Sequence, residues 1–193
     1  MAANPTSFLT PEQYLELDRS SERRSEYHNG EMYPVETSGI NHGRIQINLT
    51  VALERRLHDS PCQLVGPTVR VRIPGTKRYT YPDLIVACGD LQLEDSENDT
   101  LLNPRILFEV LSPSTRNLDQ SVKFRLYRTI PSLQEYVMVW QDRMTIERYR
   151  RQDHPQWLFD EVSGAGSILT LDSAGCSFPL SEIYSRVELT PQD

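Results

Sequence analysis

The sequence has few cysteines, no long apolar segment and no excess of positive charge. Its 3 cysteines, Cys62, Cys88 and Cys176, are odd in number and far apart, which argues against a disulfide framework or a paired-cysteine metal site. We expect Cys62 and Cys88 to be reduced thiols in the core. No segment has the length needed to span a bilayer, and the N-terminal residues lack the basic and apolar parts of a signal peptide. We therefore expect a cytoplasmic protein that does not interact with membranes.

The charge balance argues against a strongly basic nucleic-acid-binding protein. With 27 acidic and 20 basic residues, the formal charge is −7 at pH 7, which weakens nonspecific binding to DNA at physiological salt. Individual cations could still contact phosphates, although charge on a solvated strand face is the more common explanation and is preferred here. The candidates are Arg44, Arg70, Arg72, Lys77, Arg78, Arg148, Arg150 and Arg151.

The length of 193 residues predicts one domain, residues 10–193, after a polar leader at residues 1–9. Thr10, Pro11 and Gln13 form a capping-box pattern that predicts a helix start. The Asn29-Gly30 pair predicts the tight turn of a hairpin within residues 26–33. Residues 90–100 form an acidic segment without periodicity, which we expect to be an exposed loop.

Periodicity predicts the remaining elements. Helical spacing indicates helices over residues 41–59 and 114–129, with inward positions Ile45, Leu49, Ala52, Leu53 and Leu57 in the first and Leu118, Val122, Leu126 and Ile130 in the second. Strands are expected at residues 63–65, 68–73, 81–88, 105–111, 135–140, 144–150, 157–159 and 168–171, before a helical turn at 180–184. This order predicts an α/β fold with one mixed sheet, helices on a face and added hairpins.

The strand at residues 105–111 is the most informative segment, because one carboxylate, Glu109, interrupts an apolar run. Burying a carboxylate among leucines costs several kcal/mol unless a cation, a lysine or a proton compensates its charge. A neighbouring strand begins with a second acid, Asp83. Together, two acids on adjacent buried strands provide the hard oxygen ligands that suit a divalent cation. Taken singly, Asp83 is better explained by an ordinary capping hydrogen bond, whereas for Glu109 the two interpretations are balanced.

Lys123 follows on the next predicted helix and is the third candidate site residue. A metal held by Asp83 and Glu109 would activate a water, and an ammonium group would hold that water or neutralise developing charge. Apolar periodicity, however, places Lys123 one step away from the inward stripe. A surface ion pair with Asp119 fits the spacing equally well, so both interpretations stay open.

Several motifs of this chain resemble those of the Uma2 (DUF820) family, restriction-endonuclease-like proteins of the PD-(D/E)XK nuclease superfamily. They are Tyr81-Pro82-Asp83, residues 108–115, and then Asp119, Lys123, Tyr127 and Glu135-Tyr136. The resemblance covers almost the whole chain and implies a restriction-endonuclease-like mixed sheet flanked by helices. By the same resemblance, Asp83 and Glu109 are the two motif acids and bind Mg (or Mn). The motif expects a lysine two residues after the glutamate; this chain has Leu111, so the resemblance implies that Lys123 takes that role.

The resemblance also brings in two further candidates, Glu26 and His42. Glu26 matches the N-terminal hairpin pattern and would be an extra acid near the metal; a solvated hairpin residue is the alternative. For His42, at a helix start, capping or packing is the more common role.

We therefore predict a metal-dependent endonuclease that hydrolyses DNA phosphodiester bonds, with a possible homodimer spanning the duplex. Trp140 and Trp157 are the aromatics that look exposed enough for an interface. The alternative is a non-catalytic binding or accessory module that retains the nuclease fold, which the −7 charge and Leu111 favour. A nuclease for RNA or single strands is also compatible with the sequence.

Overall fold

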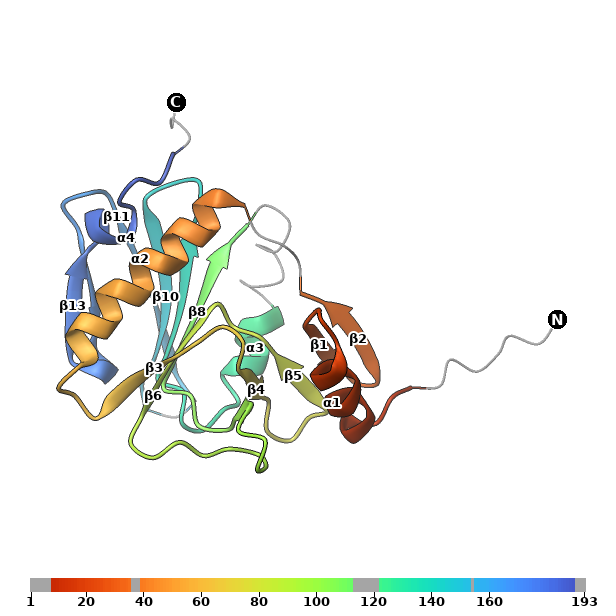
Figure 1. The fold of residues 1–193 in the computed structure, drawn as a ribbon. Coiled ribbons are helices and arrows are strands. Elements are labelled where there is room, and N and C mark those ends of the chain that lie inside the picture. The colour runs from red at the N-terminus through yellow and green to blue at the C-terminus, as the bar shows by residue number, and fades with distance from the viewer. Residues whose placement is uncertain (1–7, 36–38, 113–121, 154, 190–193) are drawn as a thin grey trace.

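A six-stranded mixed sheet lies at the centre of the computed structural model, which describes residues 8–35, 39–112, 122–153 and 155–189 (Figure 1). The strand order is β11-β10-β9-β8-β6-β3, and only β8 and β9 run parallel. The strands are β3 (Cys62–Val65), β6 (Leu84–Cys88), β8 (Ile106–Leu111), β9 (Glu135–Trp140), β10 (Thr145–Arg151) and β11 (Trp157–Ser163). All six residues of β8 are buried, as expected for an apolar run in the middle of a sheet. The predicted mixed central sheet flanked by helices is confirmed.

The long helix α2 (Ile40–Leu57) covers one face of this sheet, together with α4 (Leu180–Ile183) and the β12 (Ile168–Leu171)–β13 (Cys176–Pro179) hairpin (Figure 1). A short 3-10 turn, η2 (Asp172–Ala174), joins the two hairpin strands. The helical spacing correctly predicted which side of α2 would be buried. All five expected positions lie in the core: Ile45, Leu49, Ala52, Leu53 and Leu57.

A second, five-stranded sheet packs against the opposite face, where one mixed sheet was expected. Its order is β2-β1-β5-β4-β7, built from β1 (Ser25–His28), β2 (Glu31–Pro34), β4 (Arg70–Arg72), β5 (Arg78–Thr80) and β7 (Thr100–Leu101). Val71 of β4 and Leu101 of β7 share a buried cluster with Leu107 of β8. The β1–β5 and β4–β7 pairs join segments that are far apart in sequence, so local periodicity gave no sign of them.

The N-terminal elements follow their local signals. In α1 (Pro11–Ser20) the Thr10 side chain accepts a hydrogen bond from the Gln13 backbone, and the Gln13 side chain accepts one from the Thr10 backbone, so the capping box is confirmed. The β1–β2 hairpin turns at Asn29 and Gly30, both with positive φ, as a type I′ turn requires. The leader prediction falls mostly on residues 1–7, outside the described ranges.

Cys62 and Cys88 form a disulfide, so the prediction of two reduced thiols was wrong. The two residues are direct partners in the antiparallel β3–β6 register, with Cα atoms 3.8 Å apart. Only the pairing of β3 with β6 brings them together, because 26 residues separate them in the chain. Cys176 remains a free, buried thiol.

The acidic segment 90–100 is held to the rest of the protein more firmly than expected. Arg19 of α1 donates to Asp99 and Asp95 at 2.8 and 2.7 Å, and Tyr79 donates to Glu94 at 2.9 Å. Its last residue begins β7. The negative charges that suggested solvation instead dock this segment on cations of α1 and the second sheet.

Two further expectations need correction or fall outside the described chain. Trp140 is 5% exposed and donates to Glu147 at 3.0 Å, so it is a core residue and offers no interface. Of the helix expected at residues 114–129, the structure shows α3 (Phe124–Tyr127), while Leu118 and Asp119 lie outside the described residues. Within the described ranges, no helix is both long and apolar enough to cross a membrane.

Candidate active site

Glu109 is buried in the middle of the central strand β8, with 4% of its surface exposed. Its Oε1 atom accepts hydrogen bonds from the Lys123 ammonium at 2.9 Å and from the Tyr127 hydroxyl at 2.8 Å. Burial and the charge of Glu109 raise the pKa of Tyr127 well above its usual value, which keeps the phenol protonated as a donor. The structure therefore compensates the buried carboxylate with a lysine, one of the three possibilities that the sequence left open.

Lys123 faces inward, contrary to the position that apolar periodicity gave it. It is 9% exposed, whereas Val122 and Leu126, the expected inward residues, are only partly buried. Lys123 and Tyr127 are four residues apart and so lie on the same side of this helical turn. The buried Glu109 explains this orientation, because an uncompensated carboxylate would cost more free energy than exposing part of two aliphatic side chains. The alternative of an exposed surface residue does not fit this burial.

Glu26 reaches the same place from β1 of the second sheet. Its Oε1 atom lies 3.6 Å from Lys123 Nζ and accepts a hydrogen bond from the Tyr81 backbone at 3.2 Å. Burial opposes ionisation of Glu26, but Lys123, His28 and the Tyr81 N–H outweigh it and hold the pKa of Glu26 below its usual value. Glu26 is therefore an ionised, largely buried residue beside Lys123, not a solvated hairpin residue.

Asp83 lies just before β6, between the backbone of β8 and α2. Its Oδ2 atom accepts a hydrogen bond from the Val110 N–H at 2.7 Å and lies 3.2 Å from Nε2 of His42. Gln46 of α2 donates to the Asp83 carbonyl at 2.9 Å. The two motif acids are thus adjacent in the fold, since Asp83 binds the residue that follows Glu109, and His42 contacts an acid rather than serving as a helix cap.

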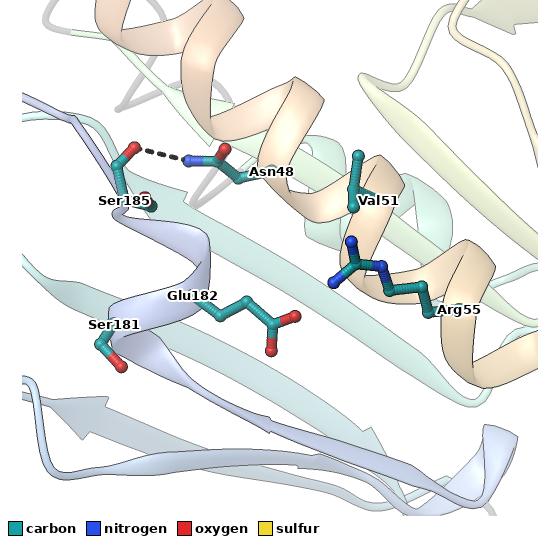
Figure 2. Close-up of a pocket in the computed structure, with 6 residues that line it drawn as sticks. All are labelled: Asn48, Val51, Arg55, Ser181, Glu182 and Ser185. Atoms are coloured by element: carbon teal, nitrogen blue, oxygen red, sulfur yellow. Dashed lines mark hydrogen bonds between the residues drawn. The ribbon is translucent and has the colours of Figure 1, made fainter.

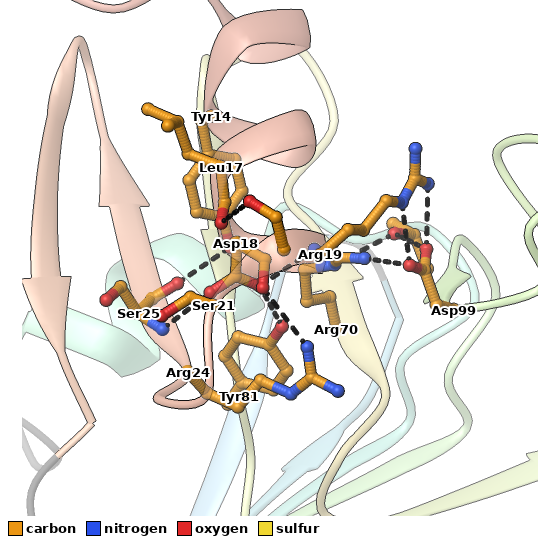
Figure 3. Close-up of polar contacts among 12 residues, drawn as sticks. Tyr14, Leu17, Asp18, Arg19, Ser21, Arg24, Ser25, Arg70, Tyr81 and Asp99 are labelled. Atoms are coloured by element: carbon orange, nitrogen blue, oxygen red, sulfur yellow. Dashed lines mark hydrogen bonds and ion pairs between the residues drawn. The ribbon is translucent and has the colours of Figure 1, made fainter.

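Tyr81 connects this site to a second buried network (Figure 3). While its backbone N–H binds Glu26, its hydroxyl donates to Asp18 of α1. Asp18, fully buried, also accepts hydrogen bonds from Arg70 Nη1 and from the Ser25 backbone, both at 2.8 Å. This network fixes Tyr81, and with it the start of the segment that leads to Asp83. Sequence reasoning assigned no role to Tyr81 or Tyr127; the four-residue spacing of Tyr127 from Lys123 was the available signal.

Two of the basic residues considered for DNA contact are buried in ion pairs. Arg70 is 1% exposed and pairs with Asp18 and Asp99, and Arg148 is 4% exposed and pairs with Glu135 and Asp160. Neither can reach a phosphate without breaking its pairs. Lys77, at the turn between β4 and β5, is exposed.

The donor set suits a magnesium-like cation better than a zinc-like one. Glu109 and Glu26 bring two carboxylates to the Lys123 ammonium, and Asp83 lies beside Glu109 through its hydrogen bond to the Val110 N–H. These four described side chains together carry a net negative charge. Nowhere in the described ranges do three or more His, Cys, Asp or Glu residues form a cluster that could hold a metal. A closed zinc site needs such a cluster, whereas Mg²⁺ keeps several waters and binds through one or two carboxylates plus substrate oxygens.

Comparisons with known proteins agree with this fold. The Uma2 family model, described as "Putative restriction endonuclease", matches residues 11–181. Two proteins of Synechocystis sp. (strain ATCC 27184 / PCC 6803 / Kazusa), "Uncharacterized protein sll1609" and "Uncharacterized protein slr1290", are each 32% identical; the matches cover 85% and 93% of this chain and 93% of each relative. A crystal structure from Anabaena variabilis ATCC 29413, of "a putative nuclease belonging to DUF820", superposes with a TM-score of 0.73 at 17% identity, over 92% of this chain and 98% of that one.

Proposed function

The chain belongs to the Uma2 family, and from that premise we propose that it is a metal-dependent endonuclease acting on DNA phosphodiester bonds. The observation that carries the proposal is the contact of Lys123 with both Glu109 and Glu26, with the other motif acid, Asp83, bound to the adjacent Val110 N–H. Restriction-endonuclease-like proteins generally use divalent metals, and the carboxylates here are of the type that Mg²⁺ prefers.

Asp83 and Glu109 would hold Mg²⁺ or Mn²⁺. When bound, such an ion polarises the phosphodiester and lowers the pKa of a bound water. Lys123 places its charged ammonium group beside Glu109. There it would orient the attacking water and offset the negative charge that develops on the phosphate. Lys123 would replace the motif lysine, whose position in this chain is occupied by Leu111.

The remaining residues orient these groups. Tyr127 fixes the Glu109 carboxylate through its hydroxyl, and His42 and the Val110 N–H fix Asp83. Glu26, ionised beside Lys123, favours the charged form of the lysine. Preorganised contacts of this kind lower the cost of assembling the reacting geometry.

A plasmid-nicking assay in the presence of Mg²⁺ or Mn²⁺ tests the proposal. We expect the wild type to nick DNA, EDTA to abolish nicking, and Lys123→Ala to lose activity while Arg23→Ala, at an exposed position, keeps it. RNA and single-stranded DNA run in parallel would identify the preferred polymer. No nicking of any polymer by well-folded wild type with either metal would reject the proposal.

Manganese binding separates the catalytic proposal from the accessory-module alternative, which the net charge of −7 favours. We expect the Asp83→Ala, Glu109→Ala double variant to lose Mn²⁺ binding in isothermal titration calorimetry, and Glu16→Ala, an exposed acid on α1, to retain it. Equal binding by the wild type and the double variant would show that these acids are structural. Binding without nicking would support the accessory module.

A further inference from the structure

The outer side of α2 carries a row of exposed apolar side chains. Ile40, Ile47 and Val51 are 76%, 65% and 43% exposed, while Leu49 and Leu53 on the inner side are fully buried. Residues spaced by seven and eleven positions lie on the same side of a helix, so these three form one stripe. Figure 1 shows α2 crossing the face of the central sheet. The exposure of these three residues places the stripe on the side of α2 away from that sheet. A row of large exposed apolar groups on a helix is typical of an interaction surface.

The residues along this stripe are arranged symmetrically about the level of Leu49. Ile47 and Val51 lie two residues to either side of it, and Arg44 and Glu54 lie five residues to either side. If two copies of α2 pack antiparallel about a twofold axis at this level, Ile47 of one copy lies level with Val51 of the other. Arg44 then lies level with Glu54, twice in the interface. A surface that complements itself in this way is what a twofold-symmetric interface requires.

A hollow beside Val51 offers room for a side chain of the partner. It has a volume of about 330 Å³ and is open to solvent between α2 and α4. Figure 2 shows Val51 and Arg55 on its α2 side and Glu182 on its α4 side. In the same antiparallel arrangement, Arg55 lies level with the partner's Gly43, whose missing side chain leaves space for it. The hollow is lined by Asn48, Val51, Arg55, Ser181, Glu182 and Ser185.

We propose that a second copy of this chain docks on α2, forming a twofold-symmetric dimer through Ile47, Val51 and reciprocal Arg44–Glu54 ion pairs. The argument uses the outer side of α2, where Ile47, Val51 and Glu54 are exposed and Arg44 is partly buried, donating a hydrogen bond to the Arg186 carbonyl. It does not depend on the proposed nuclease chemistry. About the level of Leu49, Arg44 lies opposite Glu54 and Arg55 lies opposite Gly43, so the surface matches a reversed copy of itself in charge and in side-chain size. A different partner would have no reason to share this symmetry, which is why we choose a second copy as the occupant.

Charge reversal provides a test that a general loss of folding cannot imitate. Arg44→Glu alone places like charges opposite each other twice per dimer, and so does Glu54→Arg alone. A mixture of these two variants can form a heterodimer in which both pairs are opposite in sign. By sedimentation velocity, we expect a dimeric wild type and a dimer dissociation constant raised at least roughly ten-fold in each single variant, because like charges at an interface cost several kcal/mol. The equimolar mixture should return to the sedimentation coefficient of the wild-type dimer.

Apolar substitution provides the second arm. Ile47→Asp should yield a monomer with an unchanged circular dichroism spectrum, and Ile168→Asp, at a similarly exposed apolar position on β12, should remain dimeric. A monomeric wild type across the accessible concentration range would overturn the proposal. So would a dimer that tolerates Ile47→Asp, or two variants whose mixture stays monomeric.

Discussion

Two buried ionic clusters lie on either side of Tyr81 and differ in their balance of charge. The arginine cluster comprises Asp18, Arg19, Arg70 and Asp99, in which two guanidinium groups face two carboxylates, and Arg19 also binds a third carboxylate, that of Asp95. The carboxylate cluster comprises Glu26 and Glu109, which both contact Lys123, and Asp83, which binds the Val110 N–H beside Glu109. Its described side chains present three carboxylates and one ammonium. Tyr81 contacts the first through its hydroxyl and the second through its backbone N–H.

Under the proposed function, this difference in charge separates a structural role for the arginine cluster from a functional role for the carboxylate cluster. Guanidinium groups bind carboxylates in a planar, two-point geometry, which satisfies both partners and leaves little demand for a further ion. A group with more acids than cations is less stable by itself and gains from binding a cation. We therefore interpret the arginine cluster as the group that holds α1 and the second sheet together. The carboxylate cluster is then the group whose position α1 and the second sheet fix.

The largest loss of stability should come from removing Arg70, the central cation of the arginine cluster. Arg70→Met leaves Asp18 buried without its guanidinium partner, and breaking a buried pair costs about 3–5 kcal/mol in the free energy of unfolding. Urea denaturation would measure the loss. As a control, Arg72→Met removes the pair between Arg72 and Glu94, in which the arginine is exposed, and should change stability by less than about 1 kcal/mol. Equal losses would contradict the structural role of the arginine cluster.

The next largest effect should come from replacing Lys123 in the carboxylate cluster, where a second substitution can separate the loss of activity from the loss of stability. Lys123→Met should lower the nicking rate by roughly 10²–10³-fold, the loss typical of removing a group that stabilises transition-state charge. It should also destabilise the fold, because Glu109 loses a buried partner. Adding Glu109→Gln should restore much of the stability but none of the activity, as followed by thermal melting and plasmid nicking. Recovery of activity in that double variant would exclude a catalytic role for both residues.

Acid should weaken the arginine cluster through Asp99. Mainly its hydrogen bonds with Arg19 hold the pKa of Asp99 at about 2, below its usual 3.8. A lowered pKa gives stability that is complete above the unfolded-state value and is lost as the pH falls from about 4 toward 2. Because Asp99 and Arg19 are both partly exposed and solvent screens the pair, the contribution is about 1–2 kcal/mol.

Asp99→Asn should therefore reduce stability at pH 7 and flatten its decline below pH 4, as measured by urea unfolding at a series of pH values. Asp90→Asn, at an exposed position of the same segment, provides the control. A decline of unchanged steepness in Asp99→Asn would place the acid sensitivity elsewhere in the chain.

The smallest effect on activity should come from Tyr127→Phe, which removes one of the described hydrogen bonds to Glu109 while Lys123 remains. A hydrogen bond to a charged group contributes about 1.5–3 kcal/mol, and the preserved ring keeps most of the packing. We expect a modest loss of stability in thermal melting and a smaller loss of activity than for Lys123→Met. An activity loss as large as that of Lys123→Met would give Tyr127 a direct part in the reaction.

Much of the secondary structure could be predicted because its causes are local. The Thr10 capping box, the Asn29-Gly30 turn and the buried side of α2 depend on residues within a few positions of one another. The same is true of the buried strand that carries Glu109. The candidate acids were found because a carboxylate inside an apolar run conflicts with its surroundings, and such a conflict is visible in one sequence.

The partners of those residues were harder to predict because they come from distant segments. Glu26 meets Lys123 across 97 positions of the chain, and His42 meets Asp83 across 41. The Cys62–Cys88 disulfide and the burial of Arg70 likewise follow from strand pairing and packing. For Lys123 the local signal gave the wrong side of the helix, because it counts apolar side chains and does not include the charge of Glu109 on another element.

The sequence by itself determined where most of the helices and strands form and that Glu109 is an unusual acid, because hydrophobic spacing, capping and turn formation act between neighbours. Only the tertiary structure decided which charges face each other, that Lys123 points inward and that the second sheet brings Glu26 to it. Burial in a low-dielectric interior makes each of these charges depend on a partner, and the fold alone sets which partner is within reach.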